Sequence, residues 1–476
     1  MTTLTIIWIA LPFFLGFMIY LIPRLDRYLA LGVAIISAAY AFMLFAEPSP
    51  LNLTLLDNFG VTLEADRLSG FFILTNALVT TAVICYCWPT AKTAFFYAQT
   101  IILHGSVNAT FVCADFISLY VALEVLSIAA FLLIAYPRTE RSIWVGLRYL
   151  FVSNTVMLFY LVGVALVYEK HYSFHFSGLK DAAPEALALI LLGLLTKAGI
   201  FVSGLWLPLT HSESESPVSA LMSGVVVKAA VFPMVRCALI YPEVDPIIRI
   251  FGVGTALLGV FYAVFEKDSK RMLAFHTVSQ LGFILAAPEV GGFYALTHGL
   301  VKAALFLIAG VLPSRNLKEL KQIPIDSKLW LALVIASFSI SGFPLLAGFG
   351  AKVLTMKNLL PWQVIGMNLA AVGTAISFAK LIFLPPGGEE KKLHSGFWLG
   401  VILLLGGLIA ANGVYYEAYS LANTVKPLIT IAIGWLAYFL VFQRLVIYLP
   451  RFLEQFEHLI GVMSLILIVL LWMVWT

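Results

Sequence analysis

Ionisable side chains occur inside long apolar stretches of this chain, where their charge is costly. Six of them share this setting: Glu124, Lys197, Lys228, His298, Lys302 and Lys352. A charge at the centre of a bilayer costs at least about 2.5–3.5 kcal/mol. Residues that accept this cost commonly mark proton pathways through a membrane. The set therefore predicts a buried polar track of the proton-relay kind.

The chemistry of a relay needs these residue types. Desolvation can lower the pKa of a buried lysine from about 10.4 to as low as about 5–6. A carboxylate about 4 Å away returns about 4 kcal/mol at an effective dielectric constant of about 20. Movement of Glu124 toward or away from Lys197 would therefore switch whether this lysine holds a proton. His298 and Lys302 are four residues apart and share one helix face, so like-charge repulsion could pass the change along the row through water.

A simpler interpretation exists for some of these lysines. A long side chain near the end of a membrane helix can extend its ammonium group to the interface. For Lys302 or Lys352 taken alone, extension to the interface explains the buried position as well as the relay interpretation does. Glu124, Lys197 and Lys228 lie near the centres of their apolar stretches, where such an extension is hardest. The relay interpretation therefore depends on the set as a whole.

The composition indicates that membrane-spanning elements position these residues. Hydrophobic residues make up 61% of the 476 and charged residues only 11%, against roughly 45–50% and roughly 25% in soluble domains. So few charges cannot cover a soluble globule, and disorder needs the opposite composition. The net charge of +4 includes no basic tract that would bind phosphates, so no nucleic-acid partner is expected.

About 20 mostly apolar residues can span a membrane as a helix. Sixteen segments qualify: 4–22, 28–46, 68–88, 93–113, 115–136, 143–168, 186–209, 217–241, 246–265, 271–288, 291–313, 328–357, 362–384, 396–416, 424–448 and 457–475. They lack the alternating pattern of membrane strands. We therefore expect an all-α polytopic membrane protein with about 14–16 transmembrane helices, of which the last two segments are the least clear as spans.

Two of these helices are expected to be broken. Segment 186–209 has glycines and a proline around Lys197, and segment 328–357 has Ser341, Gly342, Pro344, Gly348 and Gly350 just before its lysine. At about 1.5 Å per residue the second segment is longer than the bilayer core is thick, so it must tilt, unwind or end early. Two interrupted spans in different halves of a chain are typical of inverted-repeat transporters. Close helix packing would explain the glycines but not the paired lysines.

Basic residues in the short loops predict the orientation. If the chain crosses the membrane sixteen times, all of these groups lie on the same side of the membrane. The groups are Arg24 and Arg27; Arg138 and Arg141; Lys267, Lys270 and Arg271; Arg315, Lys318, Lys321 and Lys328; Lys391, Lys392, Arg444 and Arg451. The positive-inside rule makes that side cytoplasmic. Both termini are therefore expected on the non-cytoplasmic side, together with the acidic loop 47–67.

Four motifs carry a resemblance to a known family. They are KAG…WLPLTHSESESPVSALMSGVVVK in 197–228, LAFHTVSQLG in 273–282, HGLVKAALF in 298–306 and GFPLLAGFGAK in 342–352. In this order they resemble the antiporter-like subunits shared by respiratory complex I, membrane hydrogenases and Mrp-type Na⁺/H⁺ antiporters. The resemblance covers residues 60–385 and is greatest to the Mrp-type D subunit, followed by the complex I subunits.

The resemblance implies a fold of fourteen helices with two inverted five-helix repeats. The chain would divide into N-terminal helices (1–92), a first repeat (93–241), a second repeat (242–384) and C-terminal helices (385–476), the last of them an extension beyond the family core. The resemblance also implies a coupled acid–base pair at Glu124 and Lys197 and a central relay lysine at Lys228. His298 and Lys302 would form the next step, and Lys352 the terminal group.

Some positions depart from the family pattern. Leu209 stands where an acidic residue is common, and Ser-Glu-Ser-Pro (214–217) replaces an Ala-Pro pair. His276 occupies a position that is often tyrosine, and Lys352 replaces the glutamate of one complex I subunit. These departures fit the Mrp-type D subunit better than a complex I subunit.

The leading hypothesis is a proton-translocating subunit of a multisubunit cation/proton antiporter, with homologous membrane subunits, protons and the lipid bilayer as partners. The alternative is a proton-pumping subunit of a complex I-type NAD(P)H- or ferredoxin-quinone oxidoreductase, or of a membrane hydrogenase. In either case we expect no catalysis by this chain alone, no cofactor and no metal, in a bacterial-type inner membrane or a thylakoid membrane. Its four cysteines are interpreted as apolar packing residues: Cys85, Cys87, Cys113 and Cys237.

Two other classes remain open from the residues alone. A haem-binding electron carrier could use His104 and His298 as axial ligands, although haem would not explain the lysines. A structural membrane scaffold would tolerate replacement of every relay residue.

Overall fold

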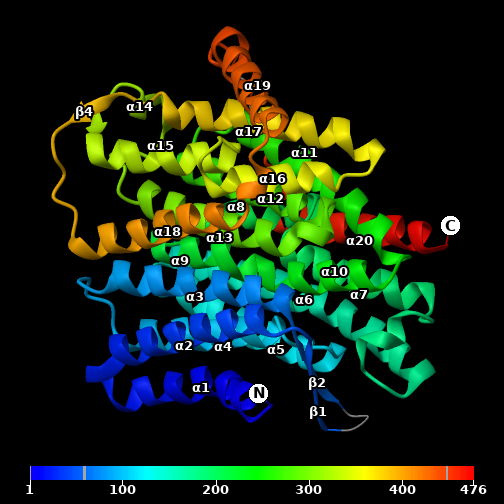
Figure 1. The fold of residues 1–476 in the computed structure, drawn as a ribbon. Helices are drawn as coiled ribbons and strands as arrows, with labels where there is room; N and C mark the ends of the chain where they lie inside the picture. The colour runs from blue at the N-terminus through cyan, green and yellow to red at the C-terminus, as the bar shows by residue number, and fades with distance from the viewer. Residues whose placement is uncertain (1, 57–59, 446, 448, 476) are drawn as a thin grey trace.

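Long helices run side by side through the molecule and form one bundle (Figure 1). The computed structural model describes residues 2–56, 60–445, 447 and 449–475. Within these residues, thirteen helices are long and apolar enough to span a membrane. The chain is therefore an all-α polytopic membrane protein, as its composition predicts.

Each of the sixteen predicted spans corresponds to a helix or to a pair of consecutive helices. In chain order these are α1 (Thr2–Leu21), α2 (Asp26–Ala46), α3 (Arg67–Cys87), α4 (Ala94–Thr110), α5 (Phe116–Ile134), α6 (Glu140–His171), α7 (Pro184–Ala198), α8 (Leu207–Glu213), α9 (Ser216–Leu221), α10 (Val227–Ile240), α11 (Val244–Phe265), α12 (Ser269–Ala286), α13 (Gly291–Ala309), α15 (Ser327–Ser341), α16 (Ala347–Lys357), α17 (Val364–Ile382), α18 (Ser395–Val414), α19 (Leu421–Ala437) and α20 (Phe456–Trp475). The two least clear segments are both helical, as α19 and α20.

The first expected break lies between α7 and α8. Helix α7 ends at Ala198 and is followed by Gly199, which has a φ of +81°, a left-handed conformation that glycine adopts without steric cost. The short helix η3 (Val202–Trp206) then leads into α8. A Cβ atom on Gly204 would lie 2.1 Å from the carbonyl oxygen of Gly199. Two glycines are thus required where the chain turns tightly beside Lys197.

The second expected break lies between α15 and α16 and has the same construction. Helix α15 ends at Ser341 and is followed by Gly342, which has a φ of +84°. A Cβ atom on Gly348 would lie 1.7 Å from the carbonyl oxygen of Ser339. Of the three outcomes predicted for the long segment 328–357, the structure shows unwinding.

The two ends of the bundle differ in their connecting elements. Strands β1 (Leu51–Leu56) and β2 (Val61–Ala65) form an antiparallel hairpin at one end, here called the hairpin end. Helix α14 (Leu317–Leu320) and the parallel strands β3 (Ile325–Asp326) and β4 (Pro386–Gly388) lie at the other end, here called the basic end. Helix α1 begins and α20 ends at the hairpin end (Figure 1). That this end faces away from the cytoplasm stays a prediction.

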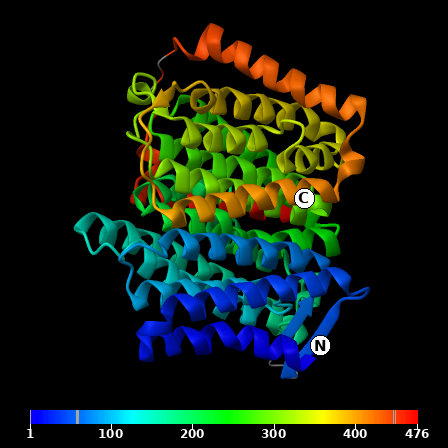
Figure 2. The same ribbon diagram turned by 60° about the vertical axis from the view of Figure 1, so that its left-hand side comes forward.

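The last two helices lie on different parts of the bundle. Helix α19 packs beside α17 at one edge of the molecule, and α20 packs against α7 (Figures 1 and 2). Residues 449–455, which lie between the two helices, cross the basic end and are fixed there by Glu454. The Glu454 carboxylate accepts two hydrogen bonds from Arg271 at 2.7 and 2.8 Å, and its carbonyl oxygen accepts one from Arg148.

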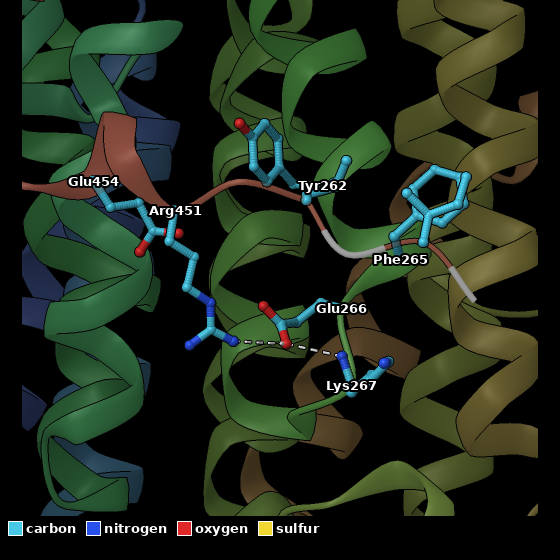
Figure 3. A pocket seen from close by; sticks show the side chains of 8 residues that line it. Tyr262, Phe265, Glu266, Lys267, Arg451 and Glu454 are labelled. Carbon is cyan, nitrogen blue, oxygen red and sulfur yellow. Dashed lines mark hydrogen bonds and ion pairs between the residues drawn. The ribbon is translucent and has the colours of Figure 1, made fainter.

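A pocket lies below this crossing, at the end of α11 (Figure 3). Glu266 lies in it and forms ion pairs with Arg271 at 3.2 Å and with Arg451 at 3.7 Å. Burial opposes ionisation of Glu266, but Arg271 and the backbone N–H groups of Asp268 and Lys267 outweigh it and lower the pKa of this carboxyl. The pocket is thus a structural ion-pair cluster that holds the crossing segment in place.

Candidate functional site: a row of buried ionisable residues

The first predicted pair forms inside the bundle, between α5 and α7. The Lys197 ammonium lies 3.8 Å from the Glu124 carboxylate, with exposed side-chain fractions of 3% and 21%. Lys197 is in the last turn of α7, directly before the break. The Glu124 side chain is therefore partly exposed, although its Oε1, which faces Lys197, is buried, and its cationic partner is enclosed.

Hydroxyl groups complete the surroundings of Lys197. Its Nζ donates to the hydroxyl oxygens of Ser127, one helical turn after Glu124 on α5, and of Ser153 on α6. The side-chain amide of Asn154, in the orientation that satisfies both of its polar groups, donates to Glu124 Oε2 at 3.2 Å. The serines and Asn154 were missed by sequence reasoning, because polar residues of this size are common in membrane helices.

Lys228 is enclosed completely, and local helix geometry provides its partner. A π-helical turn, η4 (Met222–Val226), separates α9 from α10. The Lys228 ammonium donates to the backbone carbonyl of Ser223 at 3.0 Å, and its exposed fraction is 0%. A π turn is uncommon and often occurs at functional sites, and here it lies directly before the central lysine.

His298 and Lys302 lie together on α13, as their spacing predicts. Lys302 is fully buried and donates to the backbone carbonyl of Leu273 on α12. His298 lies close enough to Lys228, Lys302 and His276 to interact with each electrostatically. These contacts are inside the bundle. The interpretation that Lys302 extends its ammonium group to the membrane interface is therefore wrong.

Lys352 lies at the second break, on α16. Its ammonium donates to the carbonyl of Ser341, the last residue of α15, at 3.2 Å, and it lies 5.5 Å from the ring centre of Phe283. The side chain is also buried, with an exposed fraction of 6% for the residue. The structure thus turns Lys352 inward, toward the unwound segment.

Three buried histidines extend the set. Within the part of the chain that the structure describes, neither ring nitrogen of His276 or His298 has a hydrogen-bond partner, and the ring of His211 contacts the backbone of Leu207. Buried polar groups in native proteins are almost always hydrogen-bonded to protein or to ordered water. These three rings therefore mark polar positions between the lysines that water can complete. His276 was noted only as a departure from the family pattern, and His211 only as part of a motif.

Two further buried lysines were missed by sequence reasoning. Lys380 of α17 donates to the carbonyls of Ala263 at 3.3 Å and Glu266 at 3.0 Å, at the end of α11. Lys270 donates to the carbonyl of Ser214 at 2.8 Å. Both lie near the basic end. From the sequence alone, a buried lysine near a helix end cannot be distinguished from an exposed lysine in a loop.

The haem hypothesis finds no support in the surroundings of His104. Its Nε2 lies 2.8 Å from the Ser37 hydroxyl, and its Nδ1 lies 3.2 Å from the Thr80 hydroxyl. Asn76 and Asn108 belong to the same network, which joins α2, α3 and α4. His104 therefore has a structural role among the first four helices.

Comparisons with known proteins agree with this arrangement. The family model described as "NADH:quinone oxidoreductase/Mrp antiporter, TM" matches residues 113–377. The chain is 26% identical over 452 residues to the D subunit of the Na⁺/H⁺ antiporter of Alkalihalophilus pseudofirmus, covering 85% of this chain and 91% of that protein. It is 28% identical over 433 residues to the N subunit of the NADH-quinone oxidoreductase of Desulforudis audaxviator, covering 79% and 85%.

Solved structures share the fold. A chain of the membrane-bound sulfane sulfur reductase, an archaeal respiratory membrane complex, superposes with a TM-score of 0.77 at 21% identity, covering 90% of this chain and 99% of that one. A chain of the Mrp complex from Dietzia sp. DQ12-45-1b gives a TM-score of 0.74 at 20% identity, covering 96% and 99%. The family model matches more than half of this chain. The chain therefore belongs to the NADH:quinone oxidoreductase/Mrp antiporter transmembrane family.

Proposed function

We propose that this chain is the proton-translocating subunit of a multisubunit cation/proton antiporter, of the kind to which the Mrp-type D subunit belongs. The observation that carries the proposal is the Glu124–Lys197 pair, in which the carboxylate of a partly exposed side chain lies 3.8 Å from an enclosed ammonium. Lys228, Lys302 and Lys352 are enclosed as well, and we assign them the steps of the relay that follow this pair.

Each member of the row has a defined task. When Glu124 lies beside Lys197, the carboxylate stabilises the protonated lysine, and Ser127 and Ser153 accept its N–H groups. When Glu124 moves away or is protonated, the enclosed ammonium loses this stabilisation and releases its proton. The hydroxyls remain as partners for the neutral amine, so the site stays formed in both states.

The proton then passes inward along hydrogen-bonded groups. Lys228 and Lys302 each use one N–H group on a backbone carbonyl, of Ser223 and Leu273 respectively. An ammonium has three donors, so the others are available to water. His298, whose ring nitrogens have no partner among the described residues, can accept a proton between them.

The surroundings of the relay favour protons over Na⁺. Na⁺ is a hard cation that prefers several oxygen ligands, and its burial without a compensating carboxylate is costly. Glu124 is the one carboxylate in the row, and the remaining charges are cationic. If the complex exchanges Na⁺, its path lies in or between partner subunits. Saturable Na⁺ binding to the purified full-length chain, abolished by Glu124→Gln, would contradict this.

Relatives support an assembled complex as the setting. The similar proteins are named as subunits, and the solved chains belong to membrane complexes. The D subunit of the Na⁺/H⁺ antiporter matches 85% of this chain, against 79% for the quinone oxidoreductase subunit, which favours an antiporter complex. The second candidate is a redox-driven complex, favoured by the 28% identity to a quinone oxidoreductase subunit. Co-purification separates them, because only the second assembly contains iron–sulfur or quinone-binding subunits.

The experiment that tests the proposal replaces Lys228 by alanine in the native complex. The rate of proton movement is measured as pH change inside membrane vesicles, and the amount of assembled complex is measured in the same preparation. We expect proton movement to stop while the complex still assembles. Lys318→Ala, which removes an exposed lysine at the basic end, is the matched control and should move protons normally. Normal proton movement by Lys228→Ala would refute the relay.

A further inference from the structure

A second pocket lies at the basic end, beside the ion-pair cluster that contains Glu266. The end of α11, the last turn of α17 and helix α14 form part of its wall. The π-helical turn η8 (Tyr438–Phe442), which directly follows α19, forms another part. The pocket encloses about 560 Å³, open solvent at the mouth included, whereas one water occupies about 30 Å³. It is therefore large enough to hold a charged group of several heavy atoms.

The charge of this pocket is strongly positive. Its lining includes four lysines, which are Lys267, Lys318, Lys321 and Lys380. Glu266 is the one carboxylate among the described residues that line it, and this carboxylate already pairs with Arg271 and Arg451. Within the described part of the chain, no carboxylate forms an ion pair with Lys318 or Lys321. Ammonium groups without a countercharge attract an anion.

The lysines of the pocket differ in what they can offer to a ligand. Lys380 donates to the carbonyls of Ala263, Val264 and Glu266, so its three donors are used and only its charge acts on the pocket. Lys318 and Lys321 are exposed, and among the described residues their ammonium groups have no hydrogen-bond acceptor. These two side chains can therefore donate to the oxygen atoms of an anionic group such as a phosphate.

The rest of the wall is apolar, which a small free anion does not need. Its apolar members are Val264, Phe265, Leu317, Phe442, Leu445 and Ile447. The ring of Tyr438 lies 5.4 Å from the Lys321 ammonium. In the same turn, Phe439 packs on Phe383 at 4.9 Å between ring centres, and both rings are exposed on the outside of the bundle. A positively charged pocket beside exposed rings fits a molecule with an anionic head and apolar chains.

Helix α19 gives such a ligand a structural role. It lies at the edge of the molecule (Figures 1 and 2) and packs mainly on α17. Along its length only Ile431 and Gly434 are buried, so few contacts with protein hold this helix in place. A ligand between η8 and the lysines of α14 would join the end of α19 to the rest of the bundle.

We infer that this pocket binds the phosphate headgroup of an anionic phospholipid from the membrane leaflet at the basic end. Lys318 and Lys321 contact the phosphate, and the acyl chains lie against Phe383 and Phe439. Basic pockets between transmembrane helices on the cytoplasmic side of a membrane bind headgroups of this class. The inference goes beyond the proposed function, because none of these residues belongs to the proton relay.

The test measures which lipid lies beside the pocket, in the native complex reconstituted into vesicles of phosphatidylglycerol and phosphatidylcholine. Gln443, an exposed residue of the lining, is replaced by cysteine and labelled with bimane. Each lipid in turn carries a nitroxide near the top of one acyl chain. Quenching of the bimane at varied lipid ratios gives the relative binding constant of the two lipids. The four native cysteines are buried, and the complex without Gln443→Cys gives the background labelling.

We expect phosphatidylglycerol to bind at least about tenfold more tightly than phosphatidylcholine, because each lysine near the surface contributes about a fivefold preference for an anionic lipid. Lys318→Ala and Lys321→Ala should each lower the preference by about this factor. Lys328→Ala is the matched control and should leave the preference unchanged, since this exposed lysine pairs with Glu390 outside the pocket. Inorganic phosphate at millimolar concentration should not relieve the quenching.

Three results would overturn the inference. Equal binding of the two lipids would show that the pocket does not recognise an anionic headgroup. An equal loss of preference in Lys328→Ala and Lys321→Ala would show that the charge of the whole basic end, and not the pocket, attracts the lipid. Relief of quenching by inorganic phosphate would show that the pocket binds the free anion instead. None of these measurements depends on proton movement, so failure of the relay is a separate result.

Discussion

The two broken helices have nearly the same backbone but different surroundings. In each, a left-handed glycine, Gly199 or Gly342, directly follows the first half. Each then brings a second glycine against a carbonyl of the first half, Gly204 against Gly199 and Gly348 against Ser339. The same unwound turn thus occurs twice, each time beside a buried lysine.

The lysines differ in what stabilises their charge. Lys197 has a carboxylate at 3.8 Å and two serine hydroxyls. Lys352 has the Ser341 carbonyl at 3.2 Å and faces a cleft. A fixed countercharge allows a neighbour to control the proton, whereas a carbonyl and water allow exchange with solution. The comparison indicates that the first break is suited to switching and the second to release.

Among changes that leave the relay lysines in place, the largest effect is expected from removing the countercharge at the first break. Glu124→Gln keeps the shape of the side chain but cannot stabilise the Lys197 ammonium. We expect the rate of proton movement to fall by about 100-fold, the lower range for loss of a proton-transfer group. Glu185→Gln, at the exposed start of α7, should leave the rate unchanged. Equal rates for both variants would remove the distinction between the two breaks.

A carboxylate added at the second break should make it resemble the first. In Ser341→Asp the new charge would stabilise the Lys352 ammonium and slow its release of protons. We expect about a tenfold loss of rate, equivalent to about 1.4 kcal/mol. Ser341→Asn has nearly the same size without the charge and separates electrostatics from packing. A tenfold loss in the asparagine variant as well would show that packing, and not charge, is responsible.

A smaller effect is expected when one of the two hydroxyls beside Lys197 is removed. Ser127→Ala or Ser153→Ala leaves the other hydroxyl and Glu124 in place. Loss of one hydrogen bond costs about 1 kcal/mol, or about fivefold in rate. The double variant should lose more than either single one. If neither single variant changes the initial rate, these hydroxyls are packing groups only.

The smallest effect on transport is expected from the left-handed glycines. A methyl group at either position costs about 1–2 kcal/mol of stability in this backbone conformation. At Gly342 the new Cβ would meet Lys352 Cδ at 2.8 Å, whereas at Gly199 it would meet Leu207 Cδ1 at 2.8 Å. Thermal unfolding of the purified complex should show similar losses for Gly199→Ala and Gly342→Ala, and only Gly342→Ala should also slow transport at equal protein amounts. Gly406→Ala, where the structure offers open space, is the control.

Much of the fold could be predicted because apolar length and glycine placement are local signals. The two breaks are examples, since clusters of Gly and Pro beside Lys197 and before Lys352 mark both. The π turn before Lys228 could not be predicted, because its helix has no comparable interruption in sequence. Its geometry depends on close packing, as at Gly224, where a Cβ would lie 3.2 Å from the carbonyl oxygen of Gly299.

The site was predicted only in its charged members. Ser127 and Ser153 are assigned by contacts between helices far apart in sequence, which one chain's residue pattern does not reveal. The missed lysines show the same limit, since Lys380 becomes a buried group only through packing of α17 on the end of α11.

The central claim is that Lys197 carries a proton and is not only an anchor for Glu124. The most direct measurement compares Lys197→Arg with Lys197→Ala in the native complex, by the rate of pH change in vesicles at equal amounts of assembled protein. A guanidinium stays charged at any accessible pH, so it can pair with Glu124 but cannot release a proton. We predict that the arginine variant fails almost as completely as the alanine variant. Transport by Lys197→Arg at a rate near that of the unsubstituted protein would contradict the relay and leave Lys197 a structural role.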